Sequence, residues 1–239
     1  MLSLTPLTFF LAFLGGILPA LLWLLFWLRE DRLDPEPRDL IVATFAAGMV
    51  STIVALIGEN GLHYFFPHLS NELSLDNPGL ILFAFIEELS KFSAAFFIAL
   101  KRRENDEPID NMIYLITAAL GFAALENAFF LLDPLSQGHF FKTLVTSDMR
   151  FLGSTLLHVV SSACIGTLMA FAFCKLPHIR RRFIVYGLIL ATALHSLFNL
   201  FILRSSDNLI PVFIVLWIGV VILLLFFERV KRINKSCVY

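Results

Sequence analysis

Charged residues are scarce in this sequence. Only 15% of its 239 residues are charged, against about 25% in an ordinary globular domain, whereas 58% are hydrophobic and 26 are phenylalanine. So little polar surface cannot cover so much apolar material in water, which makes soluble enzymes and proteins that bind nucleic acids or nucleotides poor candidates. The net charge of −1 carries no information about partners. The composition instead predicts a protein whose main partner is the lipid bilayer.

Long hydrophobic runs account for most of the chain. A helix that crosses the hydrocarbon core needs about 20 apolar residues, and seven segments reach or approach this length. No repeat and no separate soluble domain is visible between them. We therefore expect one polytopic all-α membrane domain over residues 1–239 with about seven transmembrane helices. The segments are Leu4–Leu28, Leu40–Ile57, Gly79–Leu100, Met112–Leu132, Phe151–Cys174, Phe183–Leu203 and Leu209–Phe227.

Basic residues are distributed unequally between the two sides of these segments. Fourteen of the 18 lysines and arginines lie in the connections on one side, whereas the other side has only Lys142, Arg150 and Arg204. Basic loops resist translocation, so the richer side is expected to face the cytoplasm. This pattern predicts an extracytoplasmic N-terminus and a cytoplasmic C-terminus.

Ionisable and polar side chains interrupt four of the predicted spans. Each charge near a bilayer centre costs about 2.5–3.5 kcal/mol on insertion scales, so such residues are functional candidates. With a rise of about 1.5 Å per residue, they lie at similar depths, roughly 9–14 Å from the outer ends of their spans. We therefore predict one polar chamber in the outer half of the membrane. The candidate residues are Glu87, Glu88, Lys91, Glu126, His158, His195 and Asn199.

Carboxylates and imidazoles around a hydrated chamber can activate water, protonate a leaving amine and stabilise an oxyanion, which are the three tasks of peptide hydrolysis. Two histidines and one glutamate also form a known catalytic zinc set, for which Glu126 or Glu88 with His158 and His195 are candidates. No HExxH sequence is present. A metal-bound water and a carboxylate-activated water both remain open.

Several short motifs occur in a characteristic order along the chain. They are DPEPR at residues 34–38, EELSK at 87–91, EPID at 107–110, FAALEN at 122–127, His158 followed by Gly166, and HSLFN at 195–199. Together they resemble the motifs of PrsW-type intramembrane proteases over roughly residues 29–200. A more distant similarity is to CAAX-type prenyl-protein proteases, which also have paired glutamates and a final His and Asn four residues apart. The second motif of this sequence differs from theirs, because Glu126 stands where that family has a histidine.

The resemblance implies a multi-pass endopeptidase of the bacterial inner (cytoplasmic) membrane. The best-known family member makes the first cut in an anti-sigma factor on the extracytoplasmic side, and the family has been described both as metalloprotease and as glutamic protease. We therefore expect cleavage of a membrane-protein substrate near the outer membrane boundary, with catalytic motifs within residues 79–203.

The expected roles follow from the residue types. Glu87 or Glu88 activates water with help from Glu126 and His158, while Lys91 neutralises and orients the glutamate pair. The oxyanion is stabilised by His195 and Asn199, unless Glu126, His158 and His195 hold zinc. Two alternatives are a proton- or cation-coupled transporter, which also uses buried carboxylates and histidines, and an inactive protease-like scaffold.

Overall fold

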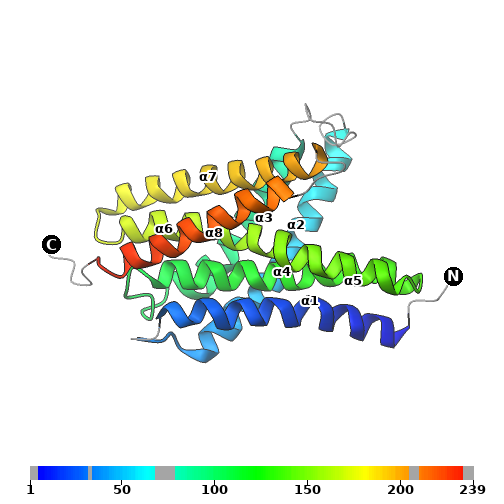
Figure 1. Cartoon of the computed structure of the whole chain (residues 1–239). Coiled ribbons are helices and arrows are strands. Elements are labelled where there is room, and N and C mark those ends of the chain that lie inside the picture. The colour runs from blue at the N-terminus through cyan, green and yellow to red at the C-terminus, as the bar shows by residue number, and fades with distance from the viewer. Residues whose placement is uncertain (1–4, 32–33, 68–78, 205–209, 234–239) are drawn as a thin grey trace.

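A computed structural model describes residues 5–31, 34–67, 79–204 and 210–233. These residues form an elongated bundle in which α1 begins at one end and α8 ends at the other (Figure 1). The helices are α1 (Pro6–Trp27), η1 (Leu28–Asp31), α2 (Arg38–Phe65), α3 (Gly79–Ala95), η3 (Phe96–Leu100), α4 (Asp110–Ser136), α5 (Phe140–Met149), η4 (Arg150–Ser154), α6 (Thr155–Phe171), α7 (Pro177–Arg204) and α8 (Ile210–Val230).

Each of the seven predicted spans coincides with a helix, which confirms the all-α membrane fold. Among the described residues, six helical segments are long and apolar enough to cross a membrane. The seventh, α3, has 17 residues and continues into the π-helical turn η3. Large apolar side chains such as Leu22, Val54 and Ile218 are exposed on the outside of the bundle, where lipid can contact them. The orientation of the termini in the membrane stays a prediction from the basic residues.

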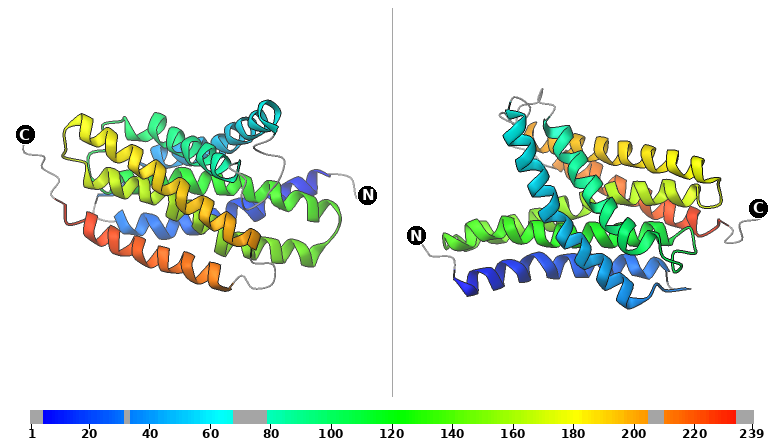
Figure 2. Two further views of the ribbon diagram at one scale, coloured as in Figure 1. Left: turned by 90° about the horizontal axis from the view of Figure 1, so that it is seen from above. Right: turned by 180° about the vertical axis from the view of Figure 1, so that it is seen from behind.

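Helix α4 forms the centre of the bundle and contacts α1, α2, α3, α5 and α6. Nearly all its residues from Asp110 to Ala128 are buried. Helix α2 crosses α4 with the two backbones in direct contact (Figure 2). A Cβ atom at Gly121 would lie 2.0 Å from the carbonyl oxygen of Phe45, and one at Gly48 would lie 2.1 Å from that of Ala118. Glycine at both crossing points is therefore what permits this approach.

The segment after the fourth predicted span differs from the expectation. Residues 133–150 were expected to form an outer loop, but α4 continues to Ser136 and α5 occupies Phe140–Met149. Polar residues within α5, such as Lys142 and Thr143, lower its hydropathy and give it the appearance of a loop in the sequence. The helix continues through the π-helical turn η4 into α6. This continuity fixes the direction of the side chains at the start of α6.

Candidate active site

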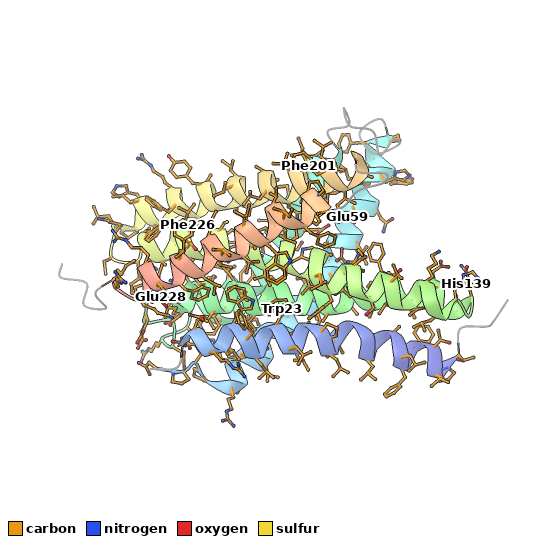
Figure 3. The ribbon with its side chains drawn as sticks, in the orientation of Figure 1. Trp23, Glu59, His139, Phe201, Phe226 and Glu228 are labelled. Atoms are coloured by element: carbon orange, nitrogen blue, oxygen red, sulfur yellow. The ribbon has the colours of Figure 1, made fainter. Side chains whose placement is uncertain are left out.

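A cavity of about 450 Å³ lies between α2, α3, α4, α6, α7 and the start of α8. Its wall includes Glu87, Glu126, His158, His195 and Asn199, so five of the seven predicted site residues meet at one place. The other two, Glu88 and Lys91, are fully buried behind this wall. Figure 3 locates the cavity-lining Glu59 in the half of the bundle that carries His139, away from the end that carries Glu228.

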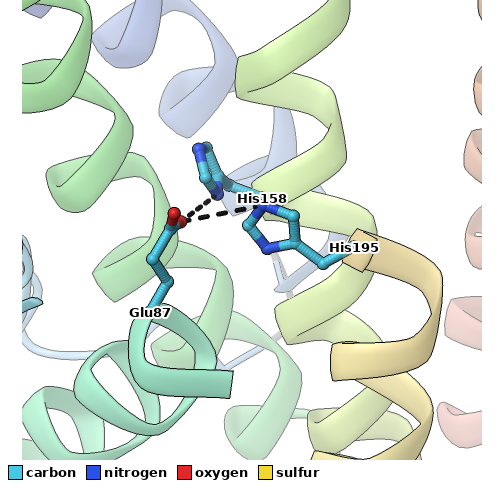
Figure 4. Close-up of side chains that lie close together, drawn as sticks. All are labelled: Glu87, His158 and His195. Carbon is cyan, nitrogen blue, oxygen red and sulfur yellow. Dashed lines mark ion pairs between the residues drawn. The ribbon is translucent and has the colours of Figure 1, made fainter. Parts of the chain in front are cut away.

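Glu87, His158 and His195 point toward one another from three different helices (Figure 4). The Oε2 atom of Glu87 lies 3.9 Å from Nδ1 of His158 and 3.7 Å from Nε2 of His195. One ligand atom from each of the three residues lies within 4.8 Å of the others. Oε2 of Glu87 is buried and has no hydrogen-bond partner among the described residues. The three side chains thus surround a small space that suits a metal ion or a water molecule.

Glu88 anchors the site from behind the cavity. Its Oε1 atom accepts hydrogen bonds from Nζ of Lys91 at 2.6 Å and from Nδ1 of His195 at 2.8 Å. Ser161 donates to the same oxygen at 2.8 Å, and Ser162 donates to Oε2 at 3.3 Å. Because Nδ1 of His195 is the donor to this carboxylate, its Nε2 atom keeps a free lone pair on the side of Glu87. The paired glutamates therefore differ in position: Glu87 faces the cavity and Glu88 orients the histidine.

His158 is held in a similar way by Glu126. Its Nε2 atom lies 3.0 Å from Oε2 of Glu126, while its Nδ1 atom lies 2.9 Å from Nζ of Lys91. A donor at Nε2 and an acceptor at Nδ1 satisfy both contacts, since the ammonium of Lys91 can only donate. Lys91 also lies over the ring of Phe122, 4.9 Å from its centroid. Lys91 therefore links Glu88 to His158.

Arg150 completes the wall on the other side of Glu126. Its guanidinium forms an ion pair with Glu126 and donates hydrogen bonds to Asn127 and to Ser154, the latter at 3.1 Å. The π-helical turn η4 provides this arginine. In a regular α-helix two residues eight positions apart point about 80° from each other, and the extra residue of a π turn brings Arg150 and His158 back to nearly the same face.

Sequence reasoning did not include Arg150, Ser154, Ser161 and Ser162 among the site residues. It placed Arg150 in a loop, because the π-helical turn leaves no sequence signal of its own. The two serines at positions 161 and 162 follow His158 by three and four residues, and that helical spacing is the signal that places them on its side of α6. Asn199 lies one helical turn after His195 and lines the cavity as expected.

The residue types fit a zinc ion, which would replace the ammonium of Lys91 at Nδ1 of His158. Two imidazoles and one carboxylate converge, and each imidazole is held at its other nitrogen by a second carboxylate, as is usual for histidines that bind zinc. The carboxylate in this group is Glu87. Glu126, which the sequence suggested as a ligand with His158 and His195, is instead paired with Arg150.

Comparisons with known proteins place the sequence among a family of membrane proteases. The sequence model of a family described as PrsW family intramembrane metalloprotease matches residues 36–227. A protein named Protease PrsW from Halalkalibacterium halodurans is 28% identical over 214 residues, which are 85% of this chain and 90% of that protein. Proteins with the same name from Oceanobacillus iheyensis and Bacillus subtilis are 26% and 25% identical; the alignments cover 94% and 85% of this chain and 96% and 89% of those proteins. No solved structure matches the chain significantly. These matches favour a peptidase over a transporter.

Proposed function

This chain belongs to the PrsW family of intramembrane metalloproteases, and on that premise we propose that it is a zinc-dependent endopeptidase that cuts a membrane protein near the extracytoplasmic boundary of the bacterial inner membrane. The observation that carries the proposal is the convergence of Glu87, His158 and His195, with one ligand atom each within 4.8 Å, at the wall of a cavity of about 450 Å³. A cavity of this size lies in the range of small-molecule and peptide side-chain sites.

In this proposal Glu87, His158 and His195 hold the metal. A bound zinc ion polarises a carbonyl group and lowers the pKa of a water molecule. Glu88 keeps the Nε2 lone pair of His195 directed toward Glu87. Glu126 orients the ring of His158, whose Nδ1 atom would exchange its hydrogen bond from Lys91 for the metal. Both carboxylates therefore reduce the freedom of the imidazoles before a substrate arrives.

The remaining cavity residues provide proton transfer and polar contacts to the peptide. Glu126 lines the cavity, and its side chain is 20% exposed. It lies outside the proposed metal group, and we assign it to proton transfer between water and the leaving amine. Asn199 lies on the same wall and is assigned to donate an amide hydrogen to the oxygen of the scissile carbonyl. Lys91 compensates the charge of Glu88.

The side of cleavage follows from the distribution of basic residues. The cavity lies away from the end of the bundle where α8 ends and where Arg229 and Lys231 are found. Because that basic end is expected to face the cytoplasm, the cavity lies in the extracytoplasmic half. A single-pass anti-sigma factor is the proposed substrate class, in line with the resemblance noted from the motifs.

Metal content and cleavage test the proposal together. The purified protein in lipid nanodiscs is assayed for zinc by mass spectrometry and is incubated with a mixture of bacterial single-pass membrane proteins, whose new N-termini are labelled and sequenced. We expect one zinc ion per chain, and cleavage that 1,10-phenanthroline abolishes and added zinc restores. Cleavage by metal-free protein would refute the zinc assignment and leave Glu87 as the base that activates water.

Matched variants test the residues. Glu87→Gln and His195→Ala should lose zinc and cleavage together while the protein still inserts into the membrane. His178→Ala is the control, because His178 lies exposed near the start of the same helix α7. Full cleavage by His195→Ala would show that the active site lies elsewhere.

A further inference from the structure

One carboxylate of the cavity wall has no role in the proposed chemistry. Glu88 is paired with Lys91, Glu126 is paired with Arg150, and Glu87 faces two imidazoles. Glu59 of α2 lines the same cavity, and within the described part of the chain it has neither an ion pair nor a hydrogen bond through its side chain. Among the described residues it is therefore the carboxylate of this wall that has no direct side-chain partner.

Glu59 faces the cavity and does not simply extend into the water beyond the membrane. It lies on the face of α2 that carries Thr52, Ala55 and Leu56, and all four residues line the cavity with the i, i+3, i+4, i+7 spacing of one helical face. The side chain is half-buried. A half-buried carboxylate without a partner is costly in a membrane, and a cationic ligand would offset that cost.

The rest of the wall fits the side chain of a basic residue. Phe129, Phe130, Phe198 and Phe213 give the cavity a largely apolar and aromatic lining. The aliphatic stem of lysine or arginine packs against such surfaces while its charged end reaches a carboxylate. An acidic side chain has no comparable partner, because the guanidinium of Arg150 is already held by Glu126, Asn127 and Ser154.

We infer that Glu59 is a specificity-determining residue that receives the cationic side chain of a lysine or arginine near the scissile bond. This inference rests on the proposed peptidase function and adds the class of substrate sequence. A substrate that carries the basic residue gains one charge-assisted contact in a partly dehydrated cavity. Such a contact contributes about tenfold in affinity, which corresponds to about 1.4 kcal/mol.

The distribution of cleavage sites provides the first test. New N-termini produced by the wild-type protein from the membrane-protein mixture should show lysine or arginine enriched at one fixed distance from the cut. A purified substrate with lysine at that distance should have a kcat/KM about tenfold above its norleucine counterpart. In Glu59→Gln this ratio should fall to about one, and Glu59→Lys should favour glutamate at the same position. Glu228→Gln, an exposed change at the far end of the bundle, should keep the wild-type ratio.

A binding measurement separates failure of this inference from failure of the peptidase assignment. Fluorescein-labelled apolar pentapeptide amides with a central lysine, norleucine or glutamate are titrated against the nanodisc-embedded protein, and fluorescence anisotropy reports their affinity. We expect the lysine peptide to bind about tenfold more tightly than the norleucine peptide, and we expect Glu59→Gln to remove the difference. Equal binding of the three peptides, or a lysine preference that persists in Glu59→Gln, would overturn the inference even if cleavage is observed. Absence of cleavage by the wild type would refute the peptidase proposal alone, since the binding ratio still decides the role of Glu59.

Discussion

Replacement of Glu88 by glutamine should weaken zinc binding although Glu88 does not line the cavity. In the native site Oε1 of Glu88 accepts hydrogen bonds from Lys91, Ser161 and His195. Glutamine keeps one carbonyl oxygen but lacks the negative charge that strengthens these bonds. The imidazole of His195 is then less firmly oriented, and Lys91 is left in the protein interior without its counter-ion at 2.6 Å.

The size of each effect follows from these contacts. Loss of an outer carboxylate that orients a metal-binding histidine typically costs 10–100-fold in metal affinity, and we expect Glu88→Gln to fall within about this range. Removal of one partner of a fully buried ion pair costs about 3–5 kcal/mol of folding stability. Glu87→Gln, by contrast, should reduce zinc affinity further and stability less, because Glu87 faces the cavity.

Zinc affinity is measured by competition with a chromophoric chelator. Stability is measured by thermal unfolding of the same nanodisc-embedded protein. The double variant Glu88→Gln/Lys91→Met separates the two effects: Lys91→Met removes the uncompensated charge, so stability should largely recover while zinc affinity stays low. If Glu88→Gln bound zinc within twofold of the wild type, the orienting role assigned to Glu88 would be refuted.

Three further predictions concern other parts of the molecule. Arg150→Lys should lower kcat about tenfold at unchanged zinc content, because an ammonium cannot bind Glu126 and the neighbouring amide as a planar guanidinium does; full activity would refute this role. Gly121→Ala should lower the free energy of unfolding by about 1–3 kcal/mol or more, whereas Gly61→Ala, which meets nothing within 4 Å, should not, and equal unfolding temperatures of the two variants would contradict the close crossing of α2 and α4. Burial raises the pKa of Glu36 above its ordinary value of 4.5, so the folded protein binds this proton more tightly than the unfolded chain. This contribution to stability is present below pH 4.5 and is lost as the pH rises through the raised pKa; Glu36→Gln should therefore show a smaller fall in unfolding temperature between pH 4 and 7.

The helices were largely predictable because apolar runs of about 20 residues have few alternatives in a membrane. Their ends were less so. Helix α2 continues eight residues beyond the predicted end at Ile57, through polar residues that suggested the membrane boundary, and this extension brings Glu59 to the cavity. Helix α5 was missed because its polar residues obscure the apolar pattern.

The composition of the site was predictable from polar residues in apolar spans, but the division of roles was not. Adjacent residues on a helix point about 100° apart, so Glu87 and Glu88 must face different surroundings. Which of them faces the cavity depends on how α3 is rotated against α6 and α7, which the sequence of α3 does not determine. The part played by Arg150 depends likewise on the π-helical turn η4.

The contribution of four separate helices to one centre has a consequence for biosynthesis. Glu87 and Glu88 are translated first, then Glu126, then His158, and His195 on α7 follows last. A nascent chain that still lacks α7 has only one of the two imidazoles. With the site proposed above, proteolytic competence is withheld until α7 has left the ribosome and entered the bilayer, so translation products that end before α7 would be inert.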